Sequence, residues 1–243
     1  MTQARKGINC MKTHEILERL AAEGTAQNRK VYARHGVALP MYGVSYGALG
    51  KLRKQIKTNH QVAVALWGSG NHDARVLACM VADPEKMTVG QLNAWSKDLA
   101  NYVLTDALAG LAAKTPHAES RLTLWTKSQS EWISSAGWGI LSSLAVAESS
   151  TPDAFFVPWI DVIVTKIHGA PNRSRHTMNN ALIAIGVRST DLAALATEAA
   201  GRVGVVTVDH GETNCTTPDA AAYIRKTLDH YAAKGKPKKR KRC

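Results

Sequence analysis

The segment richest in chemically reactive side chains runs from Asp209 to Cys215 and reads Asp-His-Gly-Glu-Thr-Asn-Cys. Imidazole, thiolate and carboxylate groups bind metals such as zinc, but zinc sites usually contain a tight pair such as Cys-x-x-Cys, which this segment lacks. We therefore predict no bound metal and no cofactor. Two interpretations stay open for Asp209, His210 and Glu212. They form either a turn rich in glycine and Asx-type residues, or a polar functional site with His210 as its acid or base.

A second group of candidate residues consists of cations spaced along predicted helices. Lys51, Lys54 and Lys57 recur every three residues, so a helix over 45–57 carries them along one face. Arg173 and Arg175 flank the start of another predicted helix, over 173–187. Each group is either a solvated helix face or a face that contacts nucleic-acid phosphates.

The bulk composition is that of a folded and basic protein. The chain has 243 residues, of which 45% are hydrophobic, and its formal net charge is +12. Residues 234–243 hold seven cations and no acid, which predicts a disordered basic tail. This tail is either a solubilising terminus or a non-specific arm on nucleic acid. We expect residues 1–10 to be a disordered extension and residues 11–233 to be a single domain.

Several sequence features bear on the cellular compartment. No apolar run approaches the length of about 18 residues that a membrane span needs, and no charged and then apolar leader opens the chain. The four cysteines, Cys10, Cys79, Cys215 and Cys243, are too scattered for a disulfide framework and predict reduced cytosolic thiols. We therefore expect a cytoplasmic protein that does not associate with membranes.

Helical periodicity recurs along almost the whole chain. Capping boxes are indicated at Thr88…Gln91 and Ser128…Glu131, and a cap before a first-turn proline at Thr151-Pro152 and Thr217-Pro218. Only Val203–Val208 has the composition of a strand. The predicted helices cover 12–23, 27–35, 45–57, 60–68, 71–82, 88–113, 117–127, 129–148, 153–168, 173–187, 189–202 and 217–233.

The arrangement of these helices is best judged from the stretch His60–Pro84. It contains two short amphipathic helices that are broken at Gly68-Ser69-Gly70, and neither can bury its apolar face alone. About a dozen helices in pairs of roughly 35–45 residues predict an all-α, HEAT-like α-solenoid of about six helix pairs with a curved concave surface. Such a surface suits a long partner such as a DNA duplex. A compact helical bundle is the alternative.

Several blocks of the sequence, in their order and spacing, are similar to the DNA alkylation repair family. That family has a HEAT-like α-solenoid fold, and its best-known members are alkylpurine DNA glycosylases. The resemblance covers about residues 40–190, while the segments 172–180 and 209–215 indicate a divergent subgroup. The matching blocks are Tyr42–Ser45 with the basic helix Gly47–Lys57, His60–Trp67, Asn71–Pro84, Trp95 with Asn101–Asp106, and the region Trp125–Trp138.

The resemblance implies a catalytic pair, Tyr102 and Asp106, which are four residues apart and so project from one helix face. An N3- or N7-alkylated purine is cationic, and loss of the base leaves an oxocarbenium-like sugar. The Asp106 carboxylate would stabilise that charge and orient a water molecule. The aromatic ring of Tyr102, where the family typically has tryptophan, would attract the cationic base.

The sequence departs from the family pattern at two further places. Ser135 stands where an arginine is expected, and Met178-Asn179-Asn180-Ala181 stands where a second tryptophan is expected. Arg173 and Arg175, together with Asn179 and Asn180, are candidates to replace the missing arginine. Among the six tryptophans, Trp95 or Trp125 is expected to face the DNA, with the others in the core.

Three functions therefore remain as hypotheses. The protein binds double-stranded DNA and excises alkylated purines, or it binds damaged or branched DNA without catalysis, or it is a helical-repeat scaffold for another protein. In the first two cases we expect a monomer associated with the bacterial nucleoid.

Overall fold

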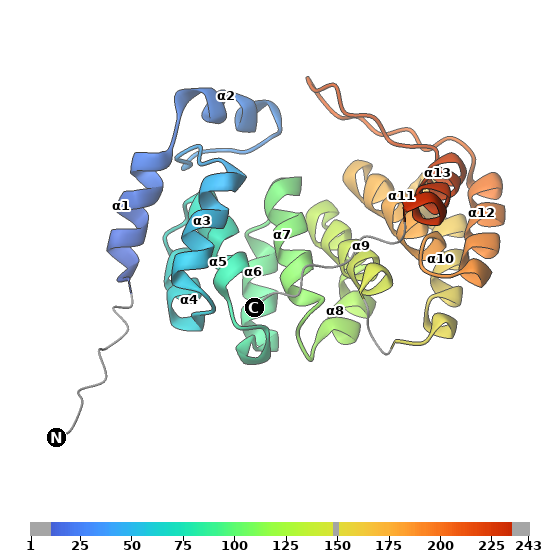
Figure 1. Ribbon diagram of the computed structural model, residues 1–243, viewed down its shortest axis with the longest axis horizontal. Helices are drawn as coiled ribbons and strands as arrows, with labels where there is room; N and C mark the ends of the chain where they lie inside the picture. Colours follow the sequence, from blue (N-terminus) through green and yellow to red (C-terminus); the bar gives the residue numbers. More distant parts are fainter. Residues whose placement is uncertain (1–10, 148–150, 235–243) are drawn as a thin grey trace. The chain divides into compact units, whose positions relative to one another are not determined.

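The computed structural model describes residues 11–147 and 151–234, and this part of the chain contains thirteen α-helices, three short 3-10 helices and no strand (Figure 1). The 3-10 helices are Pro84–Lys86, Asp153–Phe155 and Ile167–Gly169. The α-helices are α1 (Thr13–Glu23), α2 (Ala26–Arg34), α3 (Tyr46–Ile56), α4 (His60–Gly68), α5 (His72–Val81), α6 (Val89–Lys97), α7 (Tyr102–Ala112), α8 (Ala118–Trp125), α9 (Glu131–Val146), α10 (Val157–Lys166), α11 (Asn172–Gly186), α12 (Thr190–Val203) and α13 (Ala220–Lys234).

The chain divides into two compact units, one up to Pro116 and the other from His117. In the first unit, α4 and α5 pack against each other, and α3 and α7 both contact α5 (Figure 1). Leu66 of α4, Leu77 of α5 and Leu108 of α7 have no solvent-exposed surface. The first unit thus has a continuous apolar core with α5 at its centre.

In the second unit, α11 is the helix that connects most of the others. It packs against α9 and also contacts α10, α12 and α13. Gly137 of α9 lies so close to α8 that a Cβ atom at this position would be 2.6 Å from the backbone nitrogen of Thr126. This close approach of α8 and α9 requires a residue without a side chain.

Polar side chains at the predicted places begin many of the helices. The predicted Thr88…Gln91 capping box is present at α6. The predicted Ser128…Glu131 box is wrong, because α9 begins at Glu131 after Ser130, which makes no side-chain cap hydrogen bond. Single side-chain caps are supplied by Thr25, Ser45, Asn59, Asn71, Asn101 and Ser189.

The prolines of the two Thr-Pro dipeptides do not stand in the first turn of an α-helix. Pro152 precedes the 3-10 helix Asp153–Phe155, and Pro218 lies two residues before α13 begins. The first-turn positions predicted for these prolines are therefore wrong, although a helical segment follows each of them.

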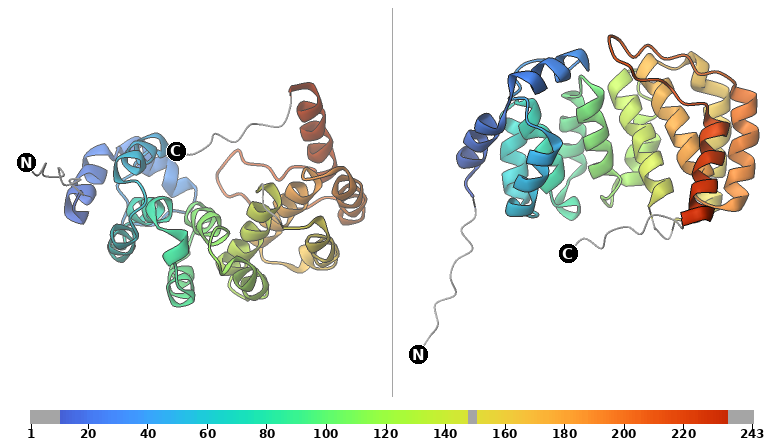
Figure 2. Two further views of the ribbon diagram at one scale, coloured as in Figure 1. Left: turned by 60° about the horizontal axis from the view of Figure 1, so that its bottom comes forward. Right: turned by 45° about the horizontal axis from the view of Figure 1, so that its top comes forward.

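Two other predicted elements differ in the structure. The helix predicted over 88–113 is two helices, α6 and α7, because Asn101 caps a new helix at Tyr102. The strand predicted over Val203–Val208 is absent. Val203 ends α12, Gly204 follows with a φ of +66°, and Val205 is 85% exposed. Residues 204–219 instead form a long loop between α12 and α13 (Figure 2).

Some predictions concern parts of the chain that the structure does not describe. The N-terminal extension 1–10 lies outside the described residues, as does the basic tail beyond Lys234. The single domain over 11–233 stays a prediction. No helix among the described residues is long and apolar enough to cross a membrane.

Candidate functional site

The predicted catalytic pair lies on α7 in the first unit. Tyr102 is the first residue of the helix, whose start is fixed by the side chain of Asn101 accepting a hydrogen bond from the Leu104 amide. Tyr102 is half-buried and Asp106 is exposed. The Tyr102 hydroxyl lies 2.8 Å from Nδ1 of His35, and the two rings meet edge to face. The structure therefore adds an imidazole to the predicted pair.

Tyr46, the first residue of α3, is a second aromatic residue near this pair. Its side chain is 51% exposed. Its pKa is raised to about 12 by partial burial and by electrostatic interaction with Tyr32, Asp106 and other groups, among them Tyr102. Tyr46 therefore keeps its proton at neutral pH and remains a hydrogen-bond donor. We call Tyr32, His35, Tyr46, Tyr102 and Asp106 the tyrosine cluster.

A buried carboxylate positions the loop that leads to Tyr46. Asp73 accepts hydrogen bonds from the backbone amides of Tyr42 at 2.6 Å, Gly43 at 3.0 Å and Val44 at 2.9 Å. Gly43 has a φ of +79°, a conformation that favours glycine. Two blocks of the family resemblance, Tyr42–Ser45 and Asn71–Pro84, therefore contact each other through Asp73.

The hydroxyl of Tyr32 also holds this loop. It donates a hydrogen bond of 2.6 Å to the carbonyl of Val44. Burial, followed by the charge of Asp73, raises the pKa of Tyr32. The hydroxyl therefore stays protonated and available as a donor at neutral pH.

The predicted basic face lies on α3, the helix that Tyr46 begins. Lys51 and Lys54 are exposed on α3, and Lys57 is exposed immediately after its last residue. The three lysines and the tyrosine cluster thus belong to the same unit. The lysines suit the negative charge of a polyanion, and the tyrosine rings suit an aromatic or cationic group that the polyanion carries.

Arg173, Asp209 and His210 come together in the second unit. At the start of α11, Asn172 donates to the carbonyl of Asp209 and accepts from its amide, both at 2.7 Å. His176 and His210 both contact the Thr217 hydroxyl, at 3.3 and 2.9 Å, with their rings edge to face. These contacts attach the 204–219 loop to α11.

The charges around this histidine pair favour neutral rings. Burial, then the charges of Arg173 and His210, lower the pKa of His176 to about 4. Burial and Arg173 also lower the pKa of His210, while Asp209 opposes them. Glu212 is exposed in the same loop. No group of three or more His, Cys, Asp or Glu residues among the described residues is arranged to hold a metal ion.

The residues that stand where the family pattern differs have separate environments. Ser135 is buried between α9 and α11, with its hydroxyl 3.4 Å from that of Ser174. Asn179 is also buried and donates to the carbonyl of Pro218 at 2.9 Å. Asn180 lines a cavity next to α13, and Arg175 is half-buried at the start of α11. Asn180 and Arg175 are therefore accessible to a ligand, whereas Ser135 and Asn179 are buried where helices pack together.

The expectation that Trp95 faces DNA is corrected by its burial. Trp95 is 5% exposed and stacks on Trp67, with ring centroids 4.1 Å apart and planes at 4°. Trp125, the alternative, is 3% exposed. Both rings bury their large aromatic surface in the core, so neither is exposed to contact DNA.

The sequence predicts a structural ion pair of Arg75 with Asp73 or Asp83, but in the structure Arg75 has a different partner. Its guanidinium contacts Asp98 at 3.0 Å, and the same carboxylate oxygen accepts a 2.8 Å hydrogen bond from the Trp67 indole. Asp73, one predicted partner, accepts hydrogen bonds from the 42–44 backbone instead, and Asp83, the other, lies beside Lys86. The prediction of a structural ion pair was right in kind and wrong in partner.

Comparison with known proteins agrees with this architecture. A family model described as DNA alkylation repair enzyme matches residues 16–224. The chain belongs to that family. Uncharacterized proteins of Listeria innocua serovar 6a and Listeria monocytogenes serovar 1/2a are each 32% identical to it over 203 residues. In both cases the match covers 81% of this chain and 88% of the relative.

A solved structure extends the comparison of this DNA alkylation repair family member to three dimensions. It matches with a TM-score of 0.86 and 28% identity, over 96% of this chain and 100% of the other. It is described as a new family of proteins related to the HEAT-like repeat DNA glycosylases with affinity for branched DNA structures. The predicted family and the all-α, HEAT-like repeat fold are confirmed.

Sequence reasoning missed His35, Tyr46 and His176 as members of these clusters. Tyr46 follows the capping residue Ser45 inside a block of the resemblance, so its place at a helix start was a usable signal. His35 and His176 carried no such signal, because their partners lie 67 and 41 residues away along the chain.

Proposed function

We propose that this protein binds double-stranded DNA, including branched DNA, through basic surfaces of its two units. The observation that carries the proposal is the likeness, over 96% of this chain, to a protein described as having affinity for branched DNA. The exposed Lys51, Lys54 and Lys57 support it, because cations at regular spacing neutralise successive phosphates.

Charge reversal on α3 tests the proposal. Binding of a labelled four-way junction and of a matched linear duplex is measured by fluorescence anisotropy for the full chain and for the double variant Lys51→Glu, Lys54→Glu. We expect the double variant to bind at least about tenfold more weakly, since two phosphate contacts become repulsions.

The matched control is the double variant Lys86→Glu, Lys97→Glu, which has the same change in net charge at two other exposed lysines of the first unit. Equal weakening in both variants would mean that net charge alone attracts the DNA. If neither variant changes junction binding, the lysines of α3 make no contribution, and the affinity comes from other cations, including those of residues 235–243.

Excision of alkylated purines is the second candidate function, and the placement of Tyr102 and Asp106 favours it. We propose that the Asp106 carboxylate stabilises the oxocarbenium-like sugar and orients water, while the tyrosine cluster supplies aromatic faces for a cationic base. The hydrogen bond between Tyr102 and His35 holds the first of these rings in place.

The test is release of 3-methyladenine and 7-methylguanine from methylated duplex DNA. Release that Asp106→Asn reduces by about a hundredfold or more, with junction binding unchanged, would establish the glycosylase. Absence of release by the parent protein, together with binding of the junction, would establish a non-catalytic binder of branched DNA.

The same proposal includes a monomer that acts on the bacterial nucleoid without a cofactor. A mass measurement in solution with and without junction DNA checks the monomer. Co-localisation of a tagged protein with DNA in cells, and its loss in the Lys51→Glu, Lys54→Glu variant, checks the nucleoid association.

A further inference from the structure

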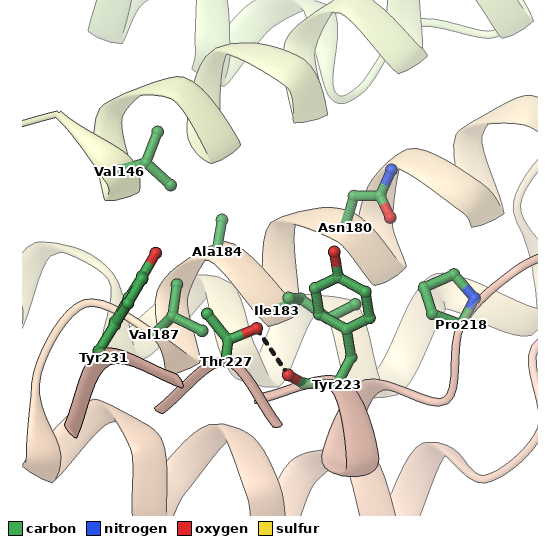
Figure 3. A pocket seen from close by; sticks show the side chains of 9 residues that line it. All are labelled: Val146, Asn180, Ile183, Ala184, Val187, Pro218, Tyr223, Thr227 and Tyr231. Atoms are coloured by element: carbon green, nitrogen blue, oxygen red, sulfur yellow. Dashed lines mark hydrogen bonds between the residues drawn. The ribbon is translucent and has the colours of Figure 1, made fainter. Parts of the chain in front are cut away.

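A cavity of about 420 Å³ lies in the second unit between α11 and α13, within the size range of small-molecule sites (Figure 3). Ile183, Ala184 and Val187 of α11 line it with apolar side chains. The predicted catalytic pair and the lysines of α3 belong to the first unit, so they do not line this cavity. We call it the α13 cavity.

Two tyrosines of α13 form the other wall of this cavity. Tyr223 and Tyr231 are eight residues apart, so they lie on one face of the helix two turns from each other. Tyr223 is 49% exposed, and both rings are visible beside the apolar residues in Figure 3. Aromatic rings over an apolar floor suit a flat aromatic ligand, because such a ligand stacks on the rings and loses apolar surface to water.

Among the described residues, Asn180 supplies the side-chain amide that lines the cavity. It lies at the same end of the cavity as Tyr223 (Figure 3). A side-chain amide has one acceptor and two donor positions and can form a bidentate pair with the edge of a nucleobase. The cavity therefore combines a surface on which a base can stack with an amide that can form hydrogen bonds to the edge of that base.

The helix surface next to the tyrosines carries basic side chains. Lys226, His230 and Lys234 follow one another at intervals of four residues, and each stands three residues after a member of the row Tyr223, Thr227, Tyr231. The two rows are therefore neighbours on α13. All three basic side chains are exposed. Proteins that bind single-stranded nucleic acid combine stacking aromatic residues with basic side chains in this way.

We propose that the α13 cavity binds one unpaired nucleobase of DNA, at a branch point or in a single-stranded segment. The base stacks against the ring of Tyr223, and its edge faces the amide of Asn180 at the same end of the cavity, while Tyr231 bounds the other end. Lys226, His230 and Lys234 contact the phosphates on either side of the base. A base inside a regular duplex is stacked and paired and cannot enter, so the cavity selects DNA in which pairing is interrupted. This inference rests on the proposed DNA-binding function and specifies which DNA the second unit recognises.

The experiment uses the full chain and two labelled duplexes that differ at one position. One duplex has a single unpaired adenine as a bulge, and the other has an abasic unit in its place. Affinities are measured by anisotropy. We expect the adenine bulge to bind about tenfold more tightly, which is the effect of stacking one base on an aromatic side chain. Replacement of the adenine by 2-aminopurine should add a fluorescence change on binding that reports the stacking itself.

Substitutions at the two tyrosines test whether the preference for the adenine bulge over the abasic duplex comes from the cavity. Tyr223→Ala with Tyr231→Ala should remove the tenfold difference, whereas Tyr223→Phe with Tyr231→Phe should keep it, because the rings remain. Leu195→Ala, at an exposed apolar residue of α12, is the matched control and should keep the difference. Thermal melting of each variant verifies that it is folded.

Two outcomes of the bulge comparison would overturn the inference without affecting the proposed function. These are equal binding of both bulges by the parent, and an undiminished preference in a folded double-alanine variant. Tight binding of free deoxyadenosine without a preference for the bulge would also overturn it, since the cavity would then be a nucleoside site. Failure of the full chain to bind any DNA would instead overturn the proposed function and this inference together.

Discussion

Asp73 shows how much of the site depends on a single side chain. Its carboxylate accepts three backbone hydrogen bonds from residues 42–44 while 1% exposed. The loop that it holds ends at Ser45, the capping residue of α3, and thereby sets the position of Tyr46. Aspartate side chains are usually exposed to solvent. Here the buried carboxylate of Asp73 holds the loop that positions the tyrosine cluster.

We therefore expect Asp73→Asn to destabilise the protein by about 3 kcal/mol or more. The substitution replaces an acceptor by an amide group that faces backbone donors, and leaves buried N–H groups without partners. Urea unfolding of the parent and the variant measures the change. The control is Asp191→Asn on the exposed first turn of α12, for which we expect a change within about 0.5 kcal/mol. A similar loss in both variants would contradict the anchoring role of Asp73.

His176 predicts a pH dependence of stability. Its pKa is about 4 in the folded protein, against an ordinary value of 6.5, because it is partly buried and faces Arg173 and His210. Between these two pH values the unfolded chain binds a proton that the folded chain does not. Stability is therefore fully present above about pH 6.5 and falls as the pH decreases towards 4.

The expected loss is on the order of 1–2 kcal/mol, since solvent reaches part of the ring and screens the interactions. Melting temperatures at a series of pH values measure it. Carboxylates elsewhere in the protein also titrate near pH 4. The informative quantity is therefore the difference between the parent and His176→Gln. If both have the same slope between pH 6.5 and 4, the histidine is not responsible.

At the scale of the elements, glycines determine how closely helices approach. A Cβ atom on Gly137 would lie 2.6 Å from the Thr126 nitrogen and 2.9 Å from the Trp125 carbonyl carbon, which are backbone atoms that cannot move independently. By contrast, a Cβ atom on Gly201 of α12 would meet no atom within 4 Å. The two glycines therefore have opposite roles, although both lie within helices.

We expect Gly137→Ala to lower the melting temperature, with a loss of about 1–3 kcal/mol from overpacking between α8 and α9. Gly201→Ala should raise it, with a gain of about 0.5–1 kcal/mol, because alanine is the better helix former. Calorimetry of both variants tests the pair. A stabilising Gly137→Ala would show that α8 and α9 do not need this close contact.

At the scale of the whole molecule, the net charge of +12 makes DNA binding a salt-dependent property. Each phosphate contact that is lost should reduce the slope of log affinity against log salt by about 0.9. We expect Lys51→Gln with Lys54→Gln to reduce that slope by about 1.8, and Lys86→Gln with Lys97→Gln to leave it unchanged. Anisotropy titrations with a four-way junction between 50 and 200 mM salt, roughly the range over which such slopes are measured, provide the test.

An unchanged slope in the α3 variant would mean that these lysines make no phosphate contact. The basic residues after Lys234 are present in every variant, so their contribution to the slope cancels in the comparison. The test therefore separates the contribution of the α3 lysines from that of the basic residues after Lys234.

Most of the secondary structure, and the family, can be predicted from the amino-acid sequence. Helical periodicity and local caps depend on residues three or four apart, so they can be read without knowledge of the fold, and the order of short motifs carried the resemblance. Predictions failed where a local pattern was ambiguous. Ser128…Glu131 has the spacing of a capping box, yet Glu131 instead accepts a hydrogen bond from the Arg173 amide. Val203–Val208 has the composition of a strand, but residues 11–147 and 151–234 contain no partner strand.

The tertiary structure alone decided which side chains meet. The partners of Tyr102, His176 and Arg75 are 67, 41 and 23 residues away along the chain. Burial was equally a tertiary property, since Trp95 stacks on Trp67 from another helix. Local spacing predicts where a side chain lies on its own helix. Only the packing of helices against one another determines whether it meets solvent, a charge or another ring.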